Sequence, residues 1–280
     1  LGLVGSEMCI RDRSSSLPHW VSASPCRTRK TVNGFIYNYE MLSRFYYPEI
    51  LKGNNQISNK THVHHICKVL RLKKNDYIQL FDGAGNHAKA KIIEVKKQII
   101  ELNVESVNKP LLIQNSKITP VMPILKKNAF LLCIEKLTEL GIEDIRVYRP
   151  DLIDQSIAKK NVNSLLDKAR EVSIAACAQS GNNFIPQIQY YENLDVFLSN
   201  SKEQVFVFDT KATDPNISDV QVKNPQASIF VLTGCESGFS SKEGKILQKQ
   251  KKFFFRTNTL RAETAIIVSC IAMKTIIGEL

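Results

Sequence analysis

Residues 227–240 have the sequence ASIFVLTGCESGFS, which is the most informative segment of the chain. Its first residues are apolar without interruption, which predicts a buried strand. Gly234 and Gly238 then allow the backbone to turn tightly and to approach a ligand closely, because neither residue has a Cβ. Ser240 with Glu243 three residues later is a capping-box pattern, so we expect a helix to begin there. A strand, a tight bend and a helix in this order are typical of α/β domains.

A second segment, LRAETA at residues 260–265, places Arg261 and Glu263 directly before an apolar run. Charged side chains that are held against a buried helix usually have a partner or a task in binding or catalysis. Residues two apart on a helix do not face each other, so the two side chains are not expected to pair as helix neighbours. The segment therefore marks a second candidate site.

Strands and helices are expected to alternate over residues 111–280. Apolar runs predict strands at 118–122, 145–148, 205–208 and 229–232, and helical spacing predicts helices at 129–140 and 162–180. Gly141 and Gly181 follow the two helices as expected C-caps. This alternation predicts an α/β domain with a mainly parallel sheet, in which ligands bind beyond the carboxyl ends of the strands. Asp209 and both segments above lie at such ends.

Residues 44–110 predict a separate, smaller β domain. Arg44-Phe45-Tyr46-Tyr47 opens it, and strand patterns fill most of 75–107. Asp82-Gly83-Ala84-Gly85-Asn86 is a strong turn signal between two of these strands. Lys109-Pro110 marks the end of the domain, which has the size of a small β-barrel.

Composition narrows the class of protein. The chain has 280 residues and is 43% hydrophobic, which is ample for a packed core. Its formal charge of +11 favours a polyanionic partner, with nucleic acid first and a membrane surface second, although simple solubility would also explain it. The seven cysteines are scattered and form no C-x-x-C pair, which favours a reducing compartment. No run of about 18 apolar residues predicts a membrane span.

Histidines and cations are concentrated in the β domain. His62, His64 and His65 fall within four residues, but strand or loop geometry would point them apart, and no Cys or carboxylate completes a zinc set, so no metal is expected. The cations of this region are Lys60, Lys68, Arg71, Lys73, Lys74, Lys89, Lys91, Lys96 and Lys97. Their density suits contacts with RNA phosphates, and a solvated basic face is the alternative.

The first 43 residues are expected to be non-native or disordered. Residues 1–13, LGLVGSEMCIRDR, resemble translated sequencing-adapter read-through, and we exclude them from the fold. Residues 14–34 contain Ser, Arg and Pro and no acidic residue, so a short targeting segment is the alternative.

Over about residues 44–278, the chain resembles a known family, the RsmE family of bacterial methyltransferases. These methyltransferases modify N3 of a uridine in small-subunit ribosomal RNA, and they belong to the SPOUT class. The motifs that carry the resemblance are Arg44-Phe45-Tyr46; His65-Ile66 with Val69-Leu70-Arg71; Phe81-Asp82-Gly83; Glu135-Lys136 with Thr138-Glu139-Leu140-Gly141; Ala175-Ala176-Cys177 with Gln179-Ser180-Gly181; Pro186; the Gly234 bend; and Leu260-Arg261 with Glu263-Thr264-Ala265. Each is weak alone, and together in this order they are specific.

The resemblance implies a PUA-like β-barrel domain at 44–110, a SPOUT-type α/β trefoil-knot methyltransferase domain at 111–280, and a homodimer. It implies S-adenosyl-L-methionine as the cofactor and small-subunit ribosomal RNA as the partner, with no metal and no membrane. The implied cofactor-binding residues are Leu232, Gly234, Gly238, Leu260, Arg261 and Thr264, and the implied RNA-binding residues are Arg44, His65, Lys68, Arg71 and Lys73. The implied location is the bacterial cytoplasm, or an organelle if the N-terminal segment is genuine.

The implied chemistry assigns roles to three charged residues. Uracil N3 carries a weakly acidic proton, so transfer requires its removal or stabilisation of the anion at O2 and O4. Arg261 suits the second task, because a guanidinium is always charged and offers several donors. Glu263 or Glu236 would act as the base or hold Arg261 in place. A purely structural ion pair across the dimer is the alternative.

The chain also departs from the family pattern. The usual G-P-E-G-G bend is Gly234-Cys235-Glu236-Ser237-Gly238 here, the usual L-G-x-R-I-L-R occupies 255–261 as FRTNTLR, and Asn182 and Phe184 replace a basic pair. A catalytically weakened RNA-binding or ribosome-assembly protein of the same fold is therefore the alternative function. A nucleotide-dependent dehydrogenase is disfavoured, because the sequence has no G-x-G-x-x-G fingerprint.

Overall fold

The computed structural model describes residues 42–109, 117–158, 161–201, 203–210 and 227–280, with 217, 220 and 222 and the backbone of 29–32 and 35–38. The chain divides into two compact units, Leu1–Met41 and Leu42–Leu280. In the first unit, β1 (Arg29–Val32) and β2 (Phe35–Asn38) form an antiparallel pair. This pair lies within the first 43 residues, which we expected to be non-native or disordered. The remaining residues of that segment up to 41 lie outside the described part of the chain.

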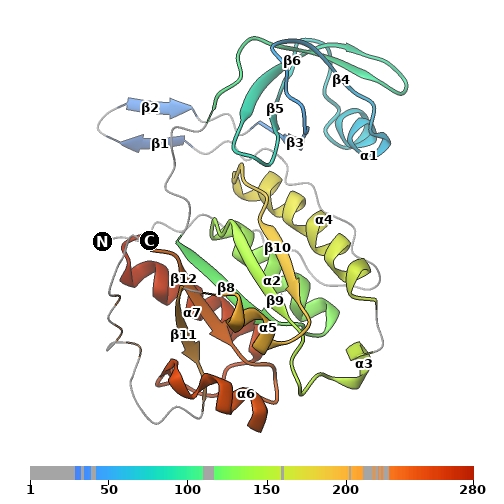
Figure 1. The fold of residues 1–280 in the computed structure, drawn as a ribbon. Coiled ribbons are helices and arrows are strands. Elements are labelled where there is room, and N and C mark those ends of the chain that lie inside the picture. Colours follow the sequence, from blue (N-terminus) through green and yellow to red (C-terminus); the bar gives the residue numbers. More distant parts are fainter. Residues whose placement is uncertain are drawn as a thin grey trace. The chain divides into compact units, whose positions relative to one another are not determined.

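The second unit begins with a five-stranded sheet, as predicted for the β domain (Figure 1). Its elements are β3 (Arg44–Tyr46), β4 (Gly53–Ile57), α1 (Lys60–His64), the π-helical turn η1 (His65–Val69), β5 (Tyr77–Phe81), β6 (His87–Val95) and β7 (Ile100–Val104). The strand order is β3-β5-β6-β7-β4, so β3 and β4 are edge strands and the predicted barrel is an open sheet among the described strands. The domain limits at 44–110 and 111–280 stay predictions.

The predicted turn at 82–86 joins β5 to β6 in an antiparallel hairpin. Asp82 organises it, because its Oδ1 accepts hydrogen bonds from the backbone N–H groups of Ala84 at 2.8 Å and Asn86 at 3.0 Å. An Asp that bonds its own following backbone is a common turn-forming device. A register shift between Ile92 and Glu94 interrupts the pairing of β6 with β7, as a β-bulge does. The hairpin signal in the sequence is therefore confirmed.

The rest of the unit is the predicted α/β domain. Its strands are β8 (Ile118–Pro123), β9 (Asp144–Tyr148), β10 (Gln187–Tyr191), β11 (Gln204–Phe208), β12 (Ile229–Thr233) and β13 (Lys251–Phe253). They form one sheet in the order β10-β9-β8-β12-β11-β13, and every pair in it is parallel. The sequence analysis missed β10 and β13, because QIQYY and KKF lack the continuous apolar runs of the central strands.

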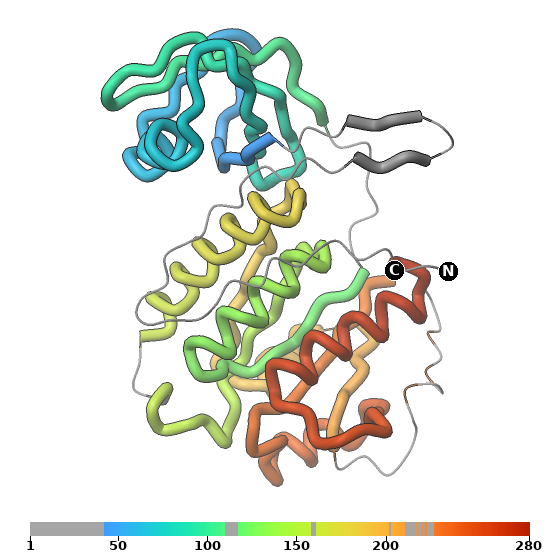
Figure 2. Tube along the Cα trace, turned by 180° about the vertical axis from the view of Figure 1, so that it is seen from behind, coloured from blue at the N-terminus to red at the C-terminus, as the bar shows by residue number. Residues whose placement is uncertain are grey.

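Helices cover both faces of this sheet. The helices are α2 (Lys127–Glu139), α3 (Gln155–Ala158), α4 (Val162–Ser180), α5 (Leu194–Ser199), α6 (Ser241–Ile246), the 3-10 turn η3 (Leu247–Lys249) and α7 (Ala262–Ile276). Helices α2, α4 and α7 share one core cluster with the sheet, and α5 and the α6–η3 segment share another. Helix α2 lies between α4 and α7 in both views (Figures 1 and 2). The domain is thus a three-layer α/β/α sandwich.

Local signals in the sequence set the ends of the helices. Helix α4 spans the predicted 162–180, with Asn161 as its N-cap and Gly181 at φ +89° as its C-cap. Gly181 suits that place because a left-handed backbone strains residues that carry a Cβ. The capping box of Ser240 and Glu243 is present at the start of α6. The parallel α/β prediction is confirmed, and the trefoil knot stays a prediction.

Candidate functional site

The two candidate segments leave the sheet at the same level. Thr233, the last residue of β12, and Phe253, the last of β13, are both registered against Phe208 of β11. Neighbouring strands lie about 4.8 Å apart, so these two strand ends are about 10 Å apart on either side of β11. Residues 234–238, the first bend, and 254–261, the second bend, therefore start from neighbouring points on the carboxyl edge, where α/β sheets bind ligands.

The first bend is tightly closed. Gly238 has φ +74°, and its N–H donates to Cys235 O at 2.8 Å. A Cβ on Gly234 would lie 3.3 Å from the carbonyl carbon of Gly238 and 3.4 Å from the ring of Phe239. Burial raises the pKa of the Cys235 thiol, so it stays protonated and donates to the carbonyl of Gly238 at 3.2 Å. This geometry agrees with the prediction that Gly234 and Gly238 allow the backbone to turn tightly.

A buried hydroxyl without a partner lies at the start of this bend. Thr233 is 2% exposed, and its Oγ1 has no hydrogen-bond partner among the described residues. The carbonyl of Thr233 is satisfied, since the Tyr148 hydroxyl donates to it at 2.9 Å. Burial raises the pKa of Tyr148 well above its ordinary value, so the phenol remains a donor. Buried polar groups are normally satisfied, so the Thr233 hydroxyl is able to accept or donate a hydrogen bond to a group that reaches the start of the first bend.

The second bend ends at Arg261, which is the N-cap of α7 in extended conformation. Its side chain is 85% exposed, and its Nη1 lies 3.8 Å from Oε1 of Glu263. The two residues were not expected to pair as helix neighbours, and they do not, because Arg261 lies outside α7. Because Arg261 lies before the first turn of α7, its side chain reaches along the N-terminal end of the helix to Glu263. Phe255, earlier in the bend, stacks on Phe208 with the ring centroids 5.3 Å apart.

The other predicted cofactor and catalytic residues have varied surroundings. Leu232 is completely buried in the core cluster, Leu260 is partly buried, and Thr264 is exposed in the first turn of α7. Glu236 is exposed, and its charge contributes to raising the pKa of Lys126, after the hydrogen bond from Lys126 to Asp154. The roles of these residues in binding and catalysis stay predictions.

The sequence analysis missed a cavity of about 400 Å³ on the same edge of the sheet. The segments that follow β8 and β9 line it, together with α3 and the first turn of α4. Neither the first nor the second bend lines it. The available signal was a cation after each of two strands, since Arg149 directly follows β9 and Lys126-Lys127 follow β8 after two apolar residues.

In the β domain, a groove of about 460 Å³ gathers cations around α1. Lysines and a histidine from two segments line it, namely Lys60, His64, Lys68, Lys96 and Lys97. Of the predicted RNA-binding residues, Lys68 lies in this groove, and Arg71 and Lys73 are exposed nearby in the sequence. His65 packs edge-on against Phe45 with the ring centroids 5.8 Å apart, and burial lowers its pKa. His65 is therefore held in the neutral form at neutral pH. Among the described residues, no three potential metal ligands come together.

Arg44, also predicted to bind RNA, is engaged inside the chain. Its guanidinium lies over the ring of Phe81 and donates to Asn183 Oδ1 at 2.6 Å and to Asn182 O at 3.1 Å. Burial lowers its pKa, and its Nε has no partner among the described atoms. Asn182 in turn donates through Nδ2 to Thr138 O at 3.0 Å. Arg44 therefore connects β3 to the end of α2 through the loop after Gly181.

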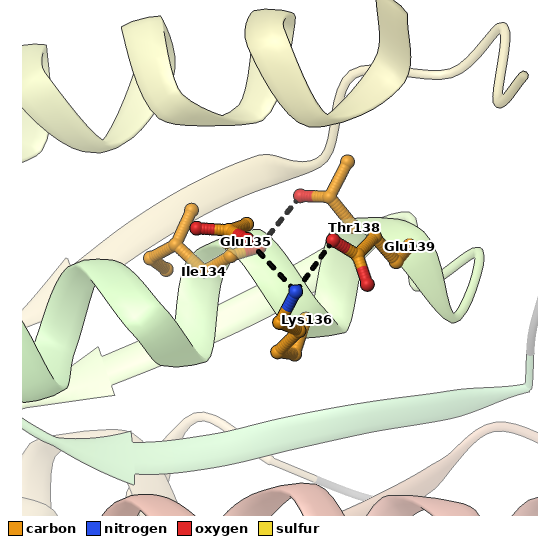
Figure 3. A network of polar contacts seen from close by, with 5 residues as sticks. All are labelled: Ile134, Glu135, Lys136, Thr138 and Glu139. Atoms are coloured by element: carbon orange, nitrogen blue, oxygen red, sulfur yellow. Dashed lines mark hydrogen bonds and ion pairs between the residues drawn. The ribbon is translucent and has the colours of Figure 1, made fainter. Parts of the chain in front are cut away.

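The polar motif on α2 is mainly structural (Figure 3). Lys136 Nζ bonds Oε1 of Glu135 and Oε1 of Glu139, both at 2.8 Å. Thr138 is fully buried, and its hydroxyl donates to Ile134 O one turn earlier at 2.7 Å. These contacts stay within the helix, so they hold the end of α2 that receives Asn182.

Comparison with known proteins locates two family matches in the chain. Residues 113–274 match the family described as RNA methyltransferase domain, and residues 59–105 match the RNA methyltransferase PUA domain. A ribosomal RNA small subunit methyltransferase E of Rickettsia conorii is 28% identical over 244 residues, which cover 85% of this chain and 96% of the relative.

Two solved structures have the same fold. One is the ribosomal RNA small subunit methyltransferase E of Neisseria gonorrhoeae bound to S-adenosyl methionine, with a TM-score of 0.69 and 24% identity, covering 84% of this chain and 98% of that one. The other is a predicted RNA methyltransferase of Thermotoga maritima, with a TM-score of 0.65 and 27% identity, covering 84% and 99%. None of the described helices combines the length and apolarity that a bilayer crossing needs.

Proposed function

The chain belongs to the RNA methyltransferase family that carries a PUA domain, and from this premise we propose that it methylates N3 of a uridine in small-subunit ribosomal RNA. The observation that carries the proposal is that the PUA match precedes the methyltransferase match on one chain. In the parallel sheet, both bends begin at the same edge. The Rickettsia protein of that name matches over 96% of its own length. The proposed site of action is the bacterial cytoplasm, which suits the scattered free cysteines.

The residues of the first bend fit S-adenosylmethionine as cofactor. Gly234 and Gly238 leave backbone free of side chains, and the unpaired Oγ1 of Thr233 offers a buried polar partner beside it. Leu260 would add apolar surface from the second bend, and Thr264 a hydroxyl from α7. When bound, the cofactor supplies an electrophilic methyl group next to a sulfonium. Cys235 and Ser237 depart from the family pattern, but both glycines of the first bend are present. The bend therefore retains the backbone conformation that a close approach to the cofactor requires.

Arg261 is the residue best placed to stabilise a uracil anion. Its guanidinium is exposed at the N-terminal end of α7, where its several donors are available to a planar acceptor. Donors aimed at the oxygens where negative charge develops lower the barrier to transfer. Glu263, whose side chain is only 15% exposed, would hold the guanidinium in place through the 3.8 Å contact. The N3 proton would pass to Glu263 or Glu236.

RNA would be held in part by the basic groove around α1. The groove brings lysines from α1, η1 and the segment after β6 to one surface of the β domain. Contacts of lysine with phosphate position RNA without reading its sequence. Lys68, Arg71 and Lys73 remain the predicted contacts in this region, with His65 as a neutral neighbour and Arg44 as the residue that anchors β3.

A homodimer is proposed from the exposed side of α7. Between Thr264 and Lys274 this helix has no charged residue, and Ile271 and Ile276 are 38% and 40% exposed. An uncharged helix face with exposed isoleucines is typical of a surface that a protein partner covers. Light scattering coupled to gel filtration tests this, with Ile271→Asp expected to shift a dimer to a monomer. A monomeric native protein would contradict it.

The decisive experiment compares nucleosides of ribosomal RNA from cells with and without the gene. Mass spectrometry should show N3-methyluridine in small-subunit RNA, its loss on deletion and its return on complementation. An unchanged N3-methyluridine signal in the deletion strain would contradict the proposal.

The alternative function is a catalytically weakened RNA-binding or ribosome-assembly protein. The observations that favour it are the departures from the family pattern at 255–261, where FRTNTLR replaces L-G-x-R-I-L-R, and at Asn182 and Phe184. Titration calorimetry with S-adenosylmethionine separates the two functions, because only the methyltransferase needs this ligand.

A further inference from the structure

The segments that follow β9 and β12 are joined at the carboxyl edge of the sheet. The two strands are not neighbours, because β8 lies between them. Two strand spacings correspond to about 10 Å, so contact between the segments depends on side chains that reach across. The Tyr148 hydroxyl donates to the carbonyl of Thr233 at 2.9 Å. The Sγ of Cys235 lies 3.6 Å from the carbonyl oxygen of Leu152, so the start of the first bend is held by the segment after β9.

The buried carboxylate of Glu243 joins the same two segments beyond the bend. Glu243 is 3% exposed, and its Oε1 accepts a hydrogen bond from the backbone N–H of Asp151 at 3.1 Å. Its Oε2 accepts the backbone N–H of Ser240 at 2.8 Å, and the Ser240 hydroxyl donates to Oδ2 of Asp151 at 2.7 Å. These hydrogen bonds form a closed set among Asp151, Ser240 and Glu243, which we call the Glu243 clasp.

Helix capping accounts for only part of the Glu243 clasp. In the capping box, Oε2 of Glu243 accepts the N–H of Ser240, and the Ser240 hydroxyl accepts the N–H of Glu243 at 3.0 Å. The hydrogen bond from Asp151 to Oε1 lies outside that motif and fixes a segment 92 positions earlier in the chain. A buried carboxylate is costly unless its oxygens are bonded, and no cation forms an ion pair with Glu243 among the described residues. Both backbone donors must therefore stay in place while the carboxylate is buried.

We propose that Glu243 is a positioning residue, whose carboxylate holds Ser240 against Asp151 and so keeps the first bend in the shape that receives the methyl donor. Thr233 precedes the bend at 234–238 and Ser240 follows it, so both of its ends are bonded to the segment after β9. A bend that is already ordered binds a ligand more tightly than one that must be ordered on binding. The inference rests on the proposed function in taking S-adenosylmethionine as the ligand of the bend.

Glu243→Gln tests this role with little change in shape. The amide keeps one acceptor oxygen and turns an NH₂ group towards a backbone N–H, so one of the two hydrogen bonds is lost. Calorimetry should show affinity for S-adenosylmethionine about tenfold lower, the loss that corresponds to one hydrogen bond to a charged group. Glu279→Gln is the matched control, because Glu279 also accepts a backbone N–H, that of Lys117 at 2.8 Å, but before β8 at the amino edge of the sheet. Wild-type affinity in Glu243→Gln would overturn the proposal.

Steady-state kinetics separate positioning from a general loss of stability. Both glutamine variants should melt at a lower temperature than the wild type, because each loses a hydrogen bond to a carboxylate. Only Glu243→Gln should raise the KM for S-adenosylmethionine, by about tenfold, with kcat and the KM for RNA within about twofold of the wild type. A fall in kcat at unchanged KM, or the same KM in both variants, would contradict a positioning role.

Asp151 provides a test that leaves the buried carboxylate intact. Its side chain is exposed, so its replacement spares the core. Asp151→Asn keeps an oxygen that accepts the hydrogen bond from the Ser240 hydroxyl, and should bind S-adenosylmethionine as the wild type does. Asp151→Ala removes that acceptor and should lower the affinity by about fivefold. Equal affinity in these two variants would contradict the Glu243 clasp, even if Glu243→Gln fails to fold.

The reactivity of the Cys235 thiol tests the clasp without any cofactor. Cys235 is 8% exposed, so iodoacetamide reaches its sulfur mainly when the first bend opens. Alkylation of Cys235, followed by peptide mass spectrometry, should be about tenfold faster in Glu243→Gln than in Glu279→Gln. Equal rates would show that the clasp does not hold the bend, and the proposal would be wrong. A wild-type protein that binds no S-adenosylmethionine would overturn the proposed function and leave this alkylation test valid.

Discussion

Arg44 Nη2 donates a 2.6 Å hydrogen bond to Oδ1 of Asn183, across 139 positions of the sequence. Asn183 Nδ2 also lies 3.2 Å from Nδ1 of His87, and its carbonyl accepts the N–H of Gly85 at 3.1 Å. The loop after α4 is thereby bonded to β3 and to the β5–β6 hairpin. Asn182, one of the two residues that replace the basic pair, also accepts a hydrogen bond from Arg44 through its carbonyl at 3.1 Å, so this loop holds the β sheet to the α/β domain.

The Arg44–Asn183 contact should show energetic coupling. Hydrogen bonds to charged groups contribute about 1.5–3 kcal/mol, so Arg44→Ala and Asn183→Ala should each lower the free energy of unfolding by about this amount. The double variant should lose less than the sum, since the same bond is removed in both. Urea denaturation measures this cycle, and Arg44→Lys serves as a control that keeps the charge without the planar fork. Strict additivity would show that the two side chains act independently.

Gly234→Ala should impair cofactor binding more than folding. The new Cβ would lie 3.3 Å from the carbonyl carbon of Gly238, so the backbone of the first bend must shift by a few tenths of an ångström. We expect the affinity for S-adenosylmethionine to fall by about tenfold, which calorimetry measures. Gly244→Ala in α6 is the matched control, because a Cβ there meets nothing within 4 Å. Equal affinity in both variants would place the cofactor elsewhere.

Arg261→Ala should remove activity and leave the fold intact. Its side chain is 85% exposed, so little packing is lost and the melting temperature should stay close to that of the wild type. Methyl transfer should fall by about tenfold or more, because one donor to the developing anion is removed. Single-turnover assays on saturating RNA measure this effect, and Lys245→Ala, an exposed cation of α6, controls for loss of charge. Wild-type turnover in Arg261→Ala would exclude this residue from the mechanism.

Asp154 should stay ionised far into the acid range. Hydrogen bonds from Ser156, and then the hydrogen bond and charge of Lys126, lower its pKa to about 2. Because the folded-state pKa lies below the unfolded value, its contribution to stability is present above about pH 3.8 and is lost as the pH falls towards 2. Carboxyl NMR titration measures the midpoint, and Ser156→Ala should raise it. A midpoint near 4 in the wild type would contradict the contacts seen here.

Much of the fold follows from local signals. The apolar run that ends at Thr233 is a fully buried central strand, and helix α4 has the predicted limits because Asn161 and Gly181 supply its caps. These features depend on neighbours along the chain, so a sequence pattern can reveal them. Strands β10 and β13 were not predicted. Their sequences are short and polar, and they form strands only because β10 pairs with β9 and β13 pairs with β11.

Patterns along the chain are enough to predict the parallel α/β domain, the hairpin at 82–86, the glycine bend at 234–238 and the family to which these motifs point. The folded structure was needed to show that the ends of β12 and β13 share Phe208 as a neighbour, that Arg44 bonds Asn183 and that a cavity lined in part by cations follows β8 and β9. The difference lies in the range of the interactions. Caps, turns and buried strands are set within a few residues, whereas these contacts join segments that come together only when the sheet forms.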